Sequence, residues 1–195
     1  MKPLLFVTGN DVKFRTASTV CKSYGLEVER MSIDIQEIQA HDGETVARDK
    51  ALRIFEELQR PVLISDDTWM IPALKNFPGP YMKFVNDMFT AEDWLRLTEP
   101  LADRRIILRQ FVVYQDKRRQ ELFYTDIDGM LLKEIRGRCQ YPHTSLTSFD
   151  GGKTTVAERI TQQRSAIAES GKRTSWHDFC EWFTAAGSTP DRKAV

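Results

Sequence analysis

Short apolar runs alternate with amphipathic segments over the first third of the chain. Residues 4–8 form an apolar run that predicts a buried strand, and residues 26–33 carry the apolar pattern of a second strand. Between them, apolar side chains recur at helical spacing up to Gly25, which is well placed to end a helix. The apolar positions of that helix are Ala17, Val20, Cys21 and Tyr24.

A second helical pattern covers residues 47–58, with Asp42 as a candidate N-cap and Pro61 just after its end. Residues 62–64 then begin another buried strand. The order strand, helix, strand, helix, strand is typical of an α/β layer.

The middle of the chain is rich in β-formers. Residues 106–114 and 121–127 are joined by a charged turn at 116–119, which predicts a hairpin, and residues 130–135 suggest a third strand. The pattern turns helical again from Thr154.

A closing helix is predicted by an apolar face that we interpret as core packing. Its members are Trp176, Phe179, Cys180 and Phe183. We therefore expect one α/β domain over residues 1–186 and a flexible polar tail over residues 187–195.

Composition narrows the class of protein without identifying it. The 195 residues carry 28 Lys and Arg against 28 Asp and Glu, so no broad basic surface for polymeric nucleic acid is expected. The 3 cysteines are scattered, which favours a reducing compartment over a disulfide framework. No segment approaches the ~20 apolar residues that span a bilayer. We expect a soluble cytoplasmic protein with neither a membrane nor a nucleic-acid partner.

The loop after the first strand can hold phosphate. Gly9 permits a tight turn, and the following helix offers free N–H groups and the positive end of its dipole. Thr8 and Asn10 add hydrogen-bond donors, and Lys13 adds a cation one turn later. A cap function for Thr8 and Asn10 explains the loop equally well.

Ser65-Asp66-Asp67-Thr68 follows the third apolar run. We expect a turn at the end of that strand to bring both carboxylates to one site, where a cation, best Mg²⁺, would relieve their repulsion. An Asx turn with a cap is the structural alternative. A phosphate loop on a neighbouring parallel strand favours the metal, because ligands gather at the carboxyl ends of such strands.

These segments, in order and spacing, resemble the inosine/xanthosine triphosphate pyrophosphatase family over residues 4–90. The resemblance is carried by Phe6-Val7-Thr8-Gly9-Asn10 with Lys13, Glu37-Ile38-Gln39, Ala47 to Ala51, Val62 to Thr68, and Pro78-Gly79-Pro80-Tyr81 with Lys83. It implies an elongated, two-lobed mixed α/β fold around a central nucleotide cleft. It also implies a homodimer that hydrolyses non-standard purine nucleoside triphosphates to monophosphate and pyrophosphate with Mg²⁺.

The resemblance also implies roles for residues in the phosphate half. Thr8, Gly9, Asn10, Lys13, Lys50 and Thr68 would hold the triphosphate, and Lys83 would face the phosphates or the base. Glu37 and Asp67 would hold the metal. Asp67 would be the general base, with Asp66 and Lys13 beside it at the catalytic centre.

The second half departs from the family pattern at Cys139 to Ser145. Tyr141 and His143 can still stack on a base, whereas Thr144 replaces the family's aspartate. The family's later Lys-Asn and Ser-His-Arg elements are missing in their usual form, and Arg164, Lys172 and Arg173 are the nearest basic substitutes. We therefore expect an altered base pocket.

Two alternatives to the enzyme remain open from the sequence. A nucleotide-binding regulatory protein would keep the cleft with little turnover, although it would not need the carboxylates. A plain α/β interaction domain would leave the matching segments unexplained.

Overall fold

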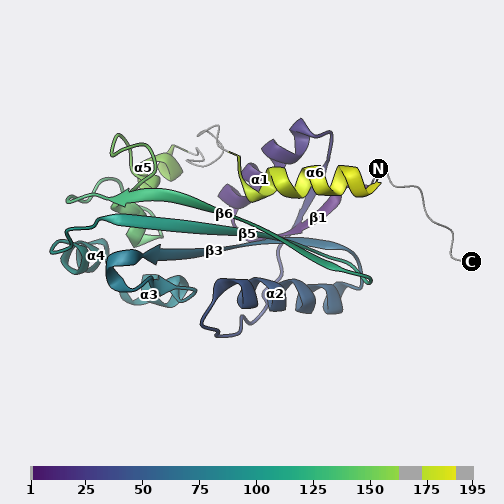
Figure 1. Ribbon diagram of the computed structural model, residues 1–195, viewed down its shortest axis with the longest axis horizontal. Helices are drawn as coiled ribbons and strands as arrows, with labels where there is room; N and C mark the ends of the chain where they lie inside the picture. Colours follow the sequence, from purple (N-terminus) through teal and green to yellow (C-terminus); the bar gives the residue numbers. More distant parts are fainter. Residues whose placement is uncertain (1, 163–172, 188–195) are drawn as a thin grey trace, which may run out of the picture.

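A long, twisted mixed sheet with helices on both faces forms the centre of the computed structural model, which describes residues 2–162 and 173–187 (Figure 1). The strand order is β2 (Val28–Met31), β1 (Leu4–Val7), β3 (Val62–Ile71), β5 (Arg105–Gln115), β6 (Gln120–Leu131), β7 (Thr147–Ser148). Strand β1 is parallel to β2 and β3, and the other pairings are antiparallel. The short β4 (Phe77–Gly79) pairs with the far part of β3.

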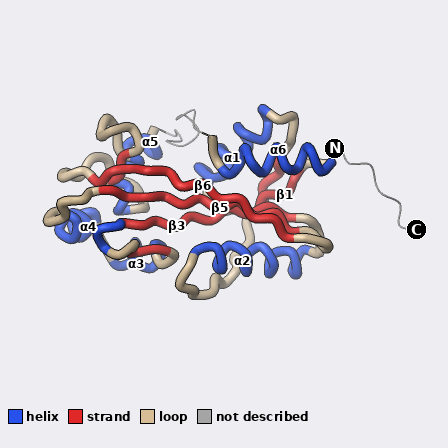
Figure 2. The backbone as a smooth tube through the Cα atoms, in the orientation of Figure 1, coloured by secondary structure: helices blue, strands red, loops and turns tan. Residues whose placement is uncertain are grey.

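The helices gather in groups around this sheet (Figure 2). Helices α1 (Asp11–Ser23) and α6 (Ser175–Gly187) lie together on one face, and α2 (Gly43–Leu58) covers the opposite face. Helices α3 (Met82–Met88), α4 (Ala91–Thr98) and α5 (Val156–Thr161) surround the other end of the long strands. Short 3₁₀ turns occupy Pro72–Leu74 and Pro142–Ser145. The molecule is therefore elongated, with one group of helices at each end.

Alternation along β3 divides the core between the two faces of the sheet. Leu63 packs with Phe6 and Trp176 under α1 and α6, whereas Ile64 packs with Ala47 of α2. A further cluster at the far end of the sheet contains Trp69, Ile71, Trp94, Ile106 and Leu108.

The mixed α/β fold and the hairpin predicted from the sequence are confirmed. The turn at 116–119 joins β5 to β6, and Asp42 caps α2 by accepting a hydrogen bond from the Thr45 N–H at 2.8 Å. The helix predicted before Gly25 begins at Asp11, directly after its N-cap Asn10.

Three boundary predictions were wrong. The strand that begins at Val62 does not end before Ser65 but continues to Ile71, because β5 pairs with it along almost its whole length. Residues 130–135 do not form a separate strand: β6 runs on to Leu131 and pairs with β7. Gly187 belongs to α6 rather than to the tail, and residues 188–195 lie outside the described residues.

Within the described residues, none of the helices has both the length and the apolar character needed to cross a membrane.

Candidate functional site

A cavity of about 430 Å³ opens where β1 ends beside the longer β3. The register between these strands contains a single pair, Phe6 with Leu63, and β4 joins β3 only from Trp69 onward. The intervening edge of β3, residues 65–68, has no strand beside it on this side within the described chain. Side chains from both faces of the sheet can therefore reach one space, as expected at the carboxyl ends of parallel strands.

Asn10 organises the loop between β1 and α1. Its Oδ1 accepts hydrogen bonds from the Val12 and Lys13 N–H groups at 2.8 and 3.1 Å, and its own N–H donates to Thr8 Oγ1 at 3.1 Å. Its Nδ2 donates to the Tyr141 hydroxyl at 3.3 Å, which links the loop to the other end of the cavity. Asn10 therefore caps α1 and also faces the cavity.

Arg30 of β2 braces this loop from outside. Its guanidinium donates to the carbonyl oxygens of Thr8 and Gly9 at 3.0 and 2.7 Å and pairs with Asp11. The loop is therefore held in shape by side chains at both ends.

The two adjacent aspartates of β3 lie on opposite faces of the sheet. Asp67 faces α1, where its Oδ2 lies 3.1 Å from Lys13 Nζ, and the two side chains are 22% and 19% exposed. The other oxygen, Oδ1, is buried without a hydrogen-bond partner. Burial opposes the charged form of Lys13, but the negative charges of Asp67 and Asp66 outweigh it and raise the pKa of this lysine.

Asp66 points toward the α2 side, where Lys50 and Glu37 form an ion pair. Burial raises the pKa of Asp66 despite the opposing charges of Lys50 and Lys13. For Glu37, burial is outweighed by the charge and hydrogen bond of Lys50, so its pKa is lowered. This end of the cavity thus holds a set of partly buried charges of both signs.

The carboxylates at this end suit a hard cation that shares its coordination sphere with substrate. Magnesium prefers oxygen, keeps several waters, and takes only one or two protein carboxylates besides substrate phosphates. Oδ1 of Asp67 is a carboxylate oxygen without a hydrogen-bond partner, and Glu37 lines the same cavity. No group of three acidic, histidine or cysteine side chains that could form a complete protein cage occurs in residues 2–162 and 173–187.

Aromatic rings line the opposite end of the cavity. The Trp69 and His143 rings meet edge to face with centroids 4.6 Å apart, and Phe149 stacks on Trp69 at 5.9 Å. His143 is buried, which lowers its pKa to about 3 and keeps the ring neutral. Tyr141, whose hydroxyl accepts the hydrogen bond from Asn10 Nδ2, links this aromatic end to the loop at the charged end.

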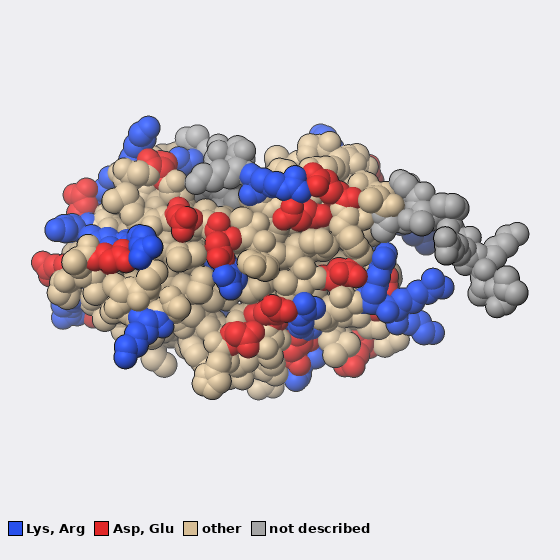
Figure 3. Space-filling model, in the orientation of Figure 1, with Lys and Arg blue, Asp and Glu red and all other residues tan. Residues whose placement is uncertain are grey.

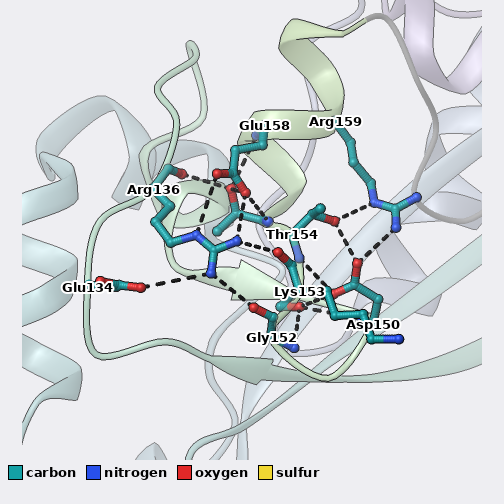
Figure 4. A network of polar contacts seen from close by, with 10 residues as sticks. Glu134, Arg136, Asp150, Gly152, Lys153, Thr154, Glu158 and Arg159 are labelled. Carbon is teal, nitrogen blue, oxygen red and sulfur yellow. Dashed lines mark hydrogen bonds and ion pairs between the residues drawn. The ribbon is translucent and has the colours of Figure 1, made fainter.

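A polar network fixes the segment that supplies this aromatic wall (Figure 4). Arg136 donates to the carbonyl oxygen of Gly152 at 3.0 Å and pairs with Glu158 of α5 at 3.1 Å. Asp150 pairs with Arg159 at 2.9 Å. Although burial acts in the opposite direction, hydrogen bonds from Thr154, Ser148 and Arg159 lower the pKa of Asp150. The network holds α5, whose Val156 and Ile160 line the cavity.

Most of the site residues predicted from the sequence line this one cavity. They are Thr8, Gly9, Asn10, Lys13, Glu37, Lys50, Asp66, Asp67, Lys83, Tyr141, His143 and Thr144.

Two predicted residues do not line it. Thr68 lies on the face of β3 that packs against α2. Its side chain is buried next to Gly43, at the start of that helix. Arg173 is exposed and pairs with Asp178 and Glu181 at 2.6 Å each. Lys172 and Arg164 lie outside the described residues.

Sequence reasoning missed several cavity residues, which are Trp69, Asn86, Gln110 and Phe149, and it gave no role to Ser65 within the segment that it singled out. Extending the strand alternation past Asp67 would have found Trp69, because Ser65, Asp67 and Trp69 share a face. Asn86 lies on α3, a helix that the sequence pattern did not predict, so nothing in the sequence indicated that this residue lines the cavity.

Comparison with known proteins agrees with this architecture. The family model described as the Ham1 family matches residues 4–175. A protein of Methanopyrus kandleri named dITP/XTP pyrophosphatase is 31% identical over 181 residues, which cover 92% of this chain and 95% of the relative. One of the same name from Methanosarcina acetivorans is 28% identical over 186 residues, covering 95% and 99% of the two chains.

Solved structures show the same fold. The HAM1 protein of Coxiella burnetii superposes with a TM-score of 0.73 at 18% identity, covering 95% of this chain and 100% of that one. The Ham1 protein of Staphylococcus aureus gives 0.69 at 14% identity, with 95% and 100% covered. The resemblance read from the sequence is confirmed, and this chain belongs to the Ham1 family.

Proposed function

We propose that this protein is a nucleoside triphosphate pyrophosphatase that hydrolyses a non-standard purine triphosphate, ribo or deoxy, to the monophosphate and pyrophosphate. The observation that carries the proposal is the shape of the cavity, which has lysines and carboxylates at one end and aromatic rings at the other. A nucleotide matches this polarity, with phosphates among the charges and a base among the rings. The names of the two archaeal relatives support the same activity.

In this assignment the lysines hold the phosphate chain. Lys13, Lys50 and Lys83 come from α1, α2 and α3 and reach the cavity from different sides. Their charges would stabilise the negative charge that develops on the departing pyrophosphate. The loop Thr8 to Asn10 contributes main-chain and side-chain donors at the start of α1.

Asp67 is the proposed general base. Its Oδ1 lacks a hydrogen-bond partner and is free to accept a proton from a water molecule that attacks the α-phosphorus. The ion pair with Lys13 fixes the carboxylate in orientation, which matters because positioning supplies much of the rate in such a reaction.

Asp67 and Glu37 would also hold Mg²⁺, which when bound would neutralise phosphate charge. The lack of a three-ligand cage among the described residues fits a cation that arrives with the substrate phosphates. The resemblance further suggests a homodimer, which light scattering of the purified protein would test.

The activity can be tested with a panel of triphosphates containing inosine, xanthosine, their deoxy forms and the standard bases. With Mg²⁺ present, we expect pyrophosphate release from the non-standard purines, and Asp67→Asn should abolish it. Asp128→Asn, which changes an exposed carboxylate of β6, is the matched control and should leave it intact. Tight nucleotide binding without release would favour the regulatory alternative, and orthophosphate as the first product would refute the proposed cleavage.

A further inference from the structure

Four of the described side chains that line the cavity carry a buried polar atom without a hydrogen-bond partner, namely Ser65, Asp67, Gln110 and His143. Two of these atoms belong to uncharged nitrogen-containing side chains: Nε2 of His143, and Oε1 of Gln110, which lies next to Asp67 across the β3–β5 pair. Both residues are only 3% exposed. Buried polar atoms of native proteins nearly always have a partner, so each of these needs an explanation.

The environment of His143 decides what its Nε2 can do. Its Nδ1 lies 2.9 Å from Oδ1 of Asn86 on α3, and an amide oxygen only accepts hydrogen bonds. The hydrogen of the neutral ring is therefore on Nδ1, and Nε2 carries a lone pair. The pKa of about 3 keeps the ring neutral, so this arrangement persists across the physiological range.

Rings hold His143 in this orientation. Trp69 meets it edge to face at 4.6 Å, and Trp94 lies at 6.1 Å on α4. Burial is the cause of its lowered pKa. A fixed, uncharged acceptor in an aromatic wall suits a ligand group that donates a hydrogen bond.

We propose that His143, positioned by Asn86, is a specificity-determining residue whose Nε2 accepts a hydrogen bond from a ring N–H of the bound base. This inference rests on the proposed function, since it places a base at the aromatic end. The 6-oxopurines, such as hypoxanthine and xanthine, carry a hydrogen on N1. Adenine has a lone pair at the same position, which would face the lone pair of Nε2.

Nε2 of His143 therefore selects bases that carry a hydrogen on N1, and not bases of a particular shape. A site built to hydrogen-bond one substrate group rejects an analogue that lacks it, because the buried partner is left unsatisfied. Gln110 Oε1, beside Asp67, is another unpartnered acceptor that lines the cavity. The hydrogen bond to His143 would take the place of contacts to the base from the Lys-Asn and Ser-His-Arg elements, which this sequence lacks in their usual form.

Binding of nucleoside monophosphates tests the inference without requiring turnover. Calorimetric titration should show inosine monophosphate binding about 5- to 150-fold more tightly than 1-methylinosine monophosphate, which keeps the 6-oxo group but lacks the N1 hydrogen. Adenosine monophosphate should bind as weakly as the methylated analogue. His143→Phe should remove the difference, whereas the matched control His177→Phe, on α6 outside the cavity lining, should keep it.

A second readout detects the hydrogen on the ring directly. In ¹⁵N-histidine NMR, where only 3 histidines contribute, His143 should show the Nδ1–H tautomer, and its Nε2 resonance should shift with inosine but not adenosine monophosphate. Asn86→Leu should remove the tautomer preference and reduce the discrimination between the two nucleotides. These spectra also show whether the variants keep the native fold.

Several outcomes would overturn the inference. An Nε2–H tautomer, equal affinity for the three monophosphates, or discrimination that survives in His143→Phe would each contradict it. Discrimination that appears or increases only in Trp94→Phe would instead show that the buried Trp94 Nε1 donates to Nε2 in the parent protein and blocks it. If the affinity ratios hold but no triphosphate is hydrolysed, the proposed activity fails and the base selection stands; if none of the nucleotides binds, both fail.

Discussion

Lys13 and Asp67 lie 3.1 Å apart at the charged end of the cavity, and Lys50 pairs with Glu37 in the same lining. A triphosphate would therefore enter a site whose cations already have carboxylate partners. Binding must exchange these ion pairs for contacts with phosphate oxygens and metal. Lys13 and Lys50 would each hold their carboxylate partner in place before the triphosphate binds. After binding, they would contact the phosphates.

Replacing Lys13 tests this double role. In Lys13→Met, Asp67 keeps its partly buried charge without a partner, and the transition state loses a cation. We expect a fall in kcat/KM of about 100-fold or more, together with a lower melting temperature. Lys22→Met, on the exposed side of the same helix, is the matched control. Equal activity of the two variants would remove Lys13 from the site.

Asp66 gives a pH-dependent prediction. Its pKa is raised in the folded protein, so the folded state binds this proton more tightly than the unfolded state does. The stabilisation is present below the unfolded pKa and is lost as the pH rises through the folded pKa. Asp66→Asn should therefore be more stable than the parent at neutral pH.

Denaturation of the two proteins at a series of pH values measures this effect. The difference in the free energy of unfolding should shrink as the pH falls below the folded pKa of Asp66. A difference that is constant with pH would show that Asp66 does not titrate with a raised pKa.

Single elements show where sequence reasoning succeeds and where it fails. The first strand and the Asp42 cap carry local signals in their own residues, and the structure bears them out. The predicted end of the third strand was wrong, because the polar residues Ser65-Asp66-Asp67-Thr68 have the local pattern of a turn. Pairing with β5, more than 35 residues later, extends the strand through these polar residues. Tertiary pairing of this kind leaves no mark in the local pattern.

The side chain of Asn10 caps the N-terminus of α1 and is expected to stabilise the folded protein. Asn10→Ala removes the acceptor for two N–H groups, so we expect about 1 kcal/mol less stability toward unfolding. Asn10→Asp keeps the acceptor and should preserve stability, while it loses the donor to Tyr141. If both variants unfold like the parent, the cap does not contribute to stability.

Close contact between α2 and β3 depends on Gly43. A Cβ atom there would lie 1.9 Å from Thr68 Oγ1 and 3.0 Å from the Phe111 ring. Gly43→Ala should therefore destabilise the protein by about 1–3 kcal/mol. Chemical denaturation of Gly43→Ala combined with Thr68→Ala should show partial recovery, because the larger clash is relieved. No recovery would mean that the backbone has shifted instead.

Across the whole molecule, the residues of the charged end of the cavity could be predicted from the sequence, whereas those of the aromatic end could be predicted only in part. The residues of the charged end follow recognisable strands and loops within the first 90 positions, and at the aromatic end the sequence indicated Tyr141 and His143. The aromatic end is assembled from β3, α3 and the segment at 141–149, which meet only in the folded chain. Asn86 and Phe149 share no spacing with the other cavity residues that a sequence pattern could reveal.

The balance of 28 basic and 28 acidic residues also has a structural counterpart. On the face drawn in Figure 3, both signs are interspersed over the surface, without one broad basic area. Inside the cavity, positive and negative charges also lie side by side, because Lys13 pairs with Asp67 and Lys50 pairs with Glu37. A single nucleotide needs only such a small charged pocket, whereas a nucleic-acid polymer is bound through many phosphates.

Hydrolysis of deoxyinosine triphosphate in ¹⁸O-labelled water, with Mg²⁺ and mass-spectrometric analysis of both products, shows which phosphorus atom the water attacks. If water attacks the α-phosphorus in the cavity beside Asp67, the label should appear in the monophosphate, and the pyrophosphate should be unlabelled. Labelled pyrophosphate, or orthophosphate and diphosphate in place of these products, would contradict the account.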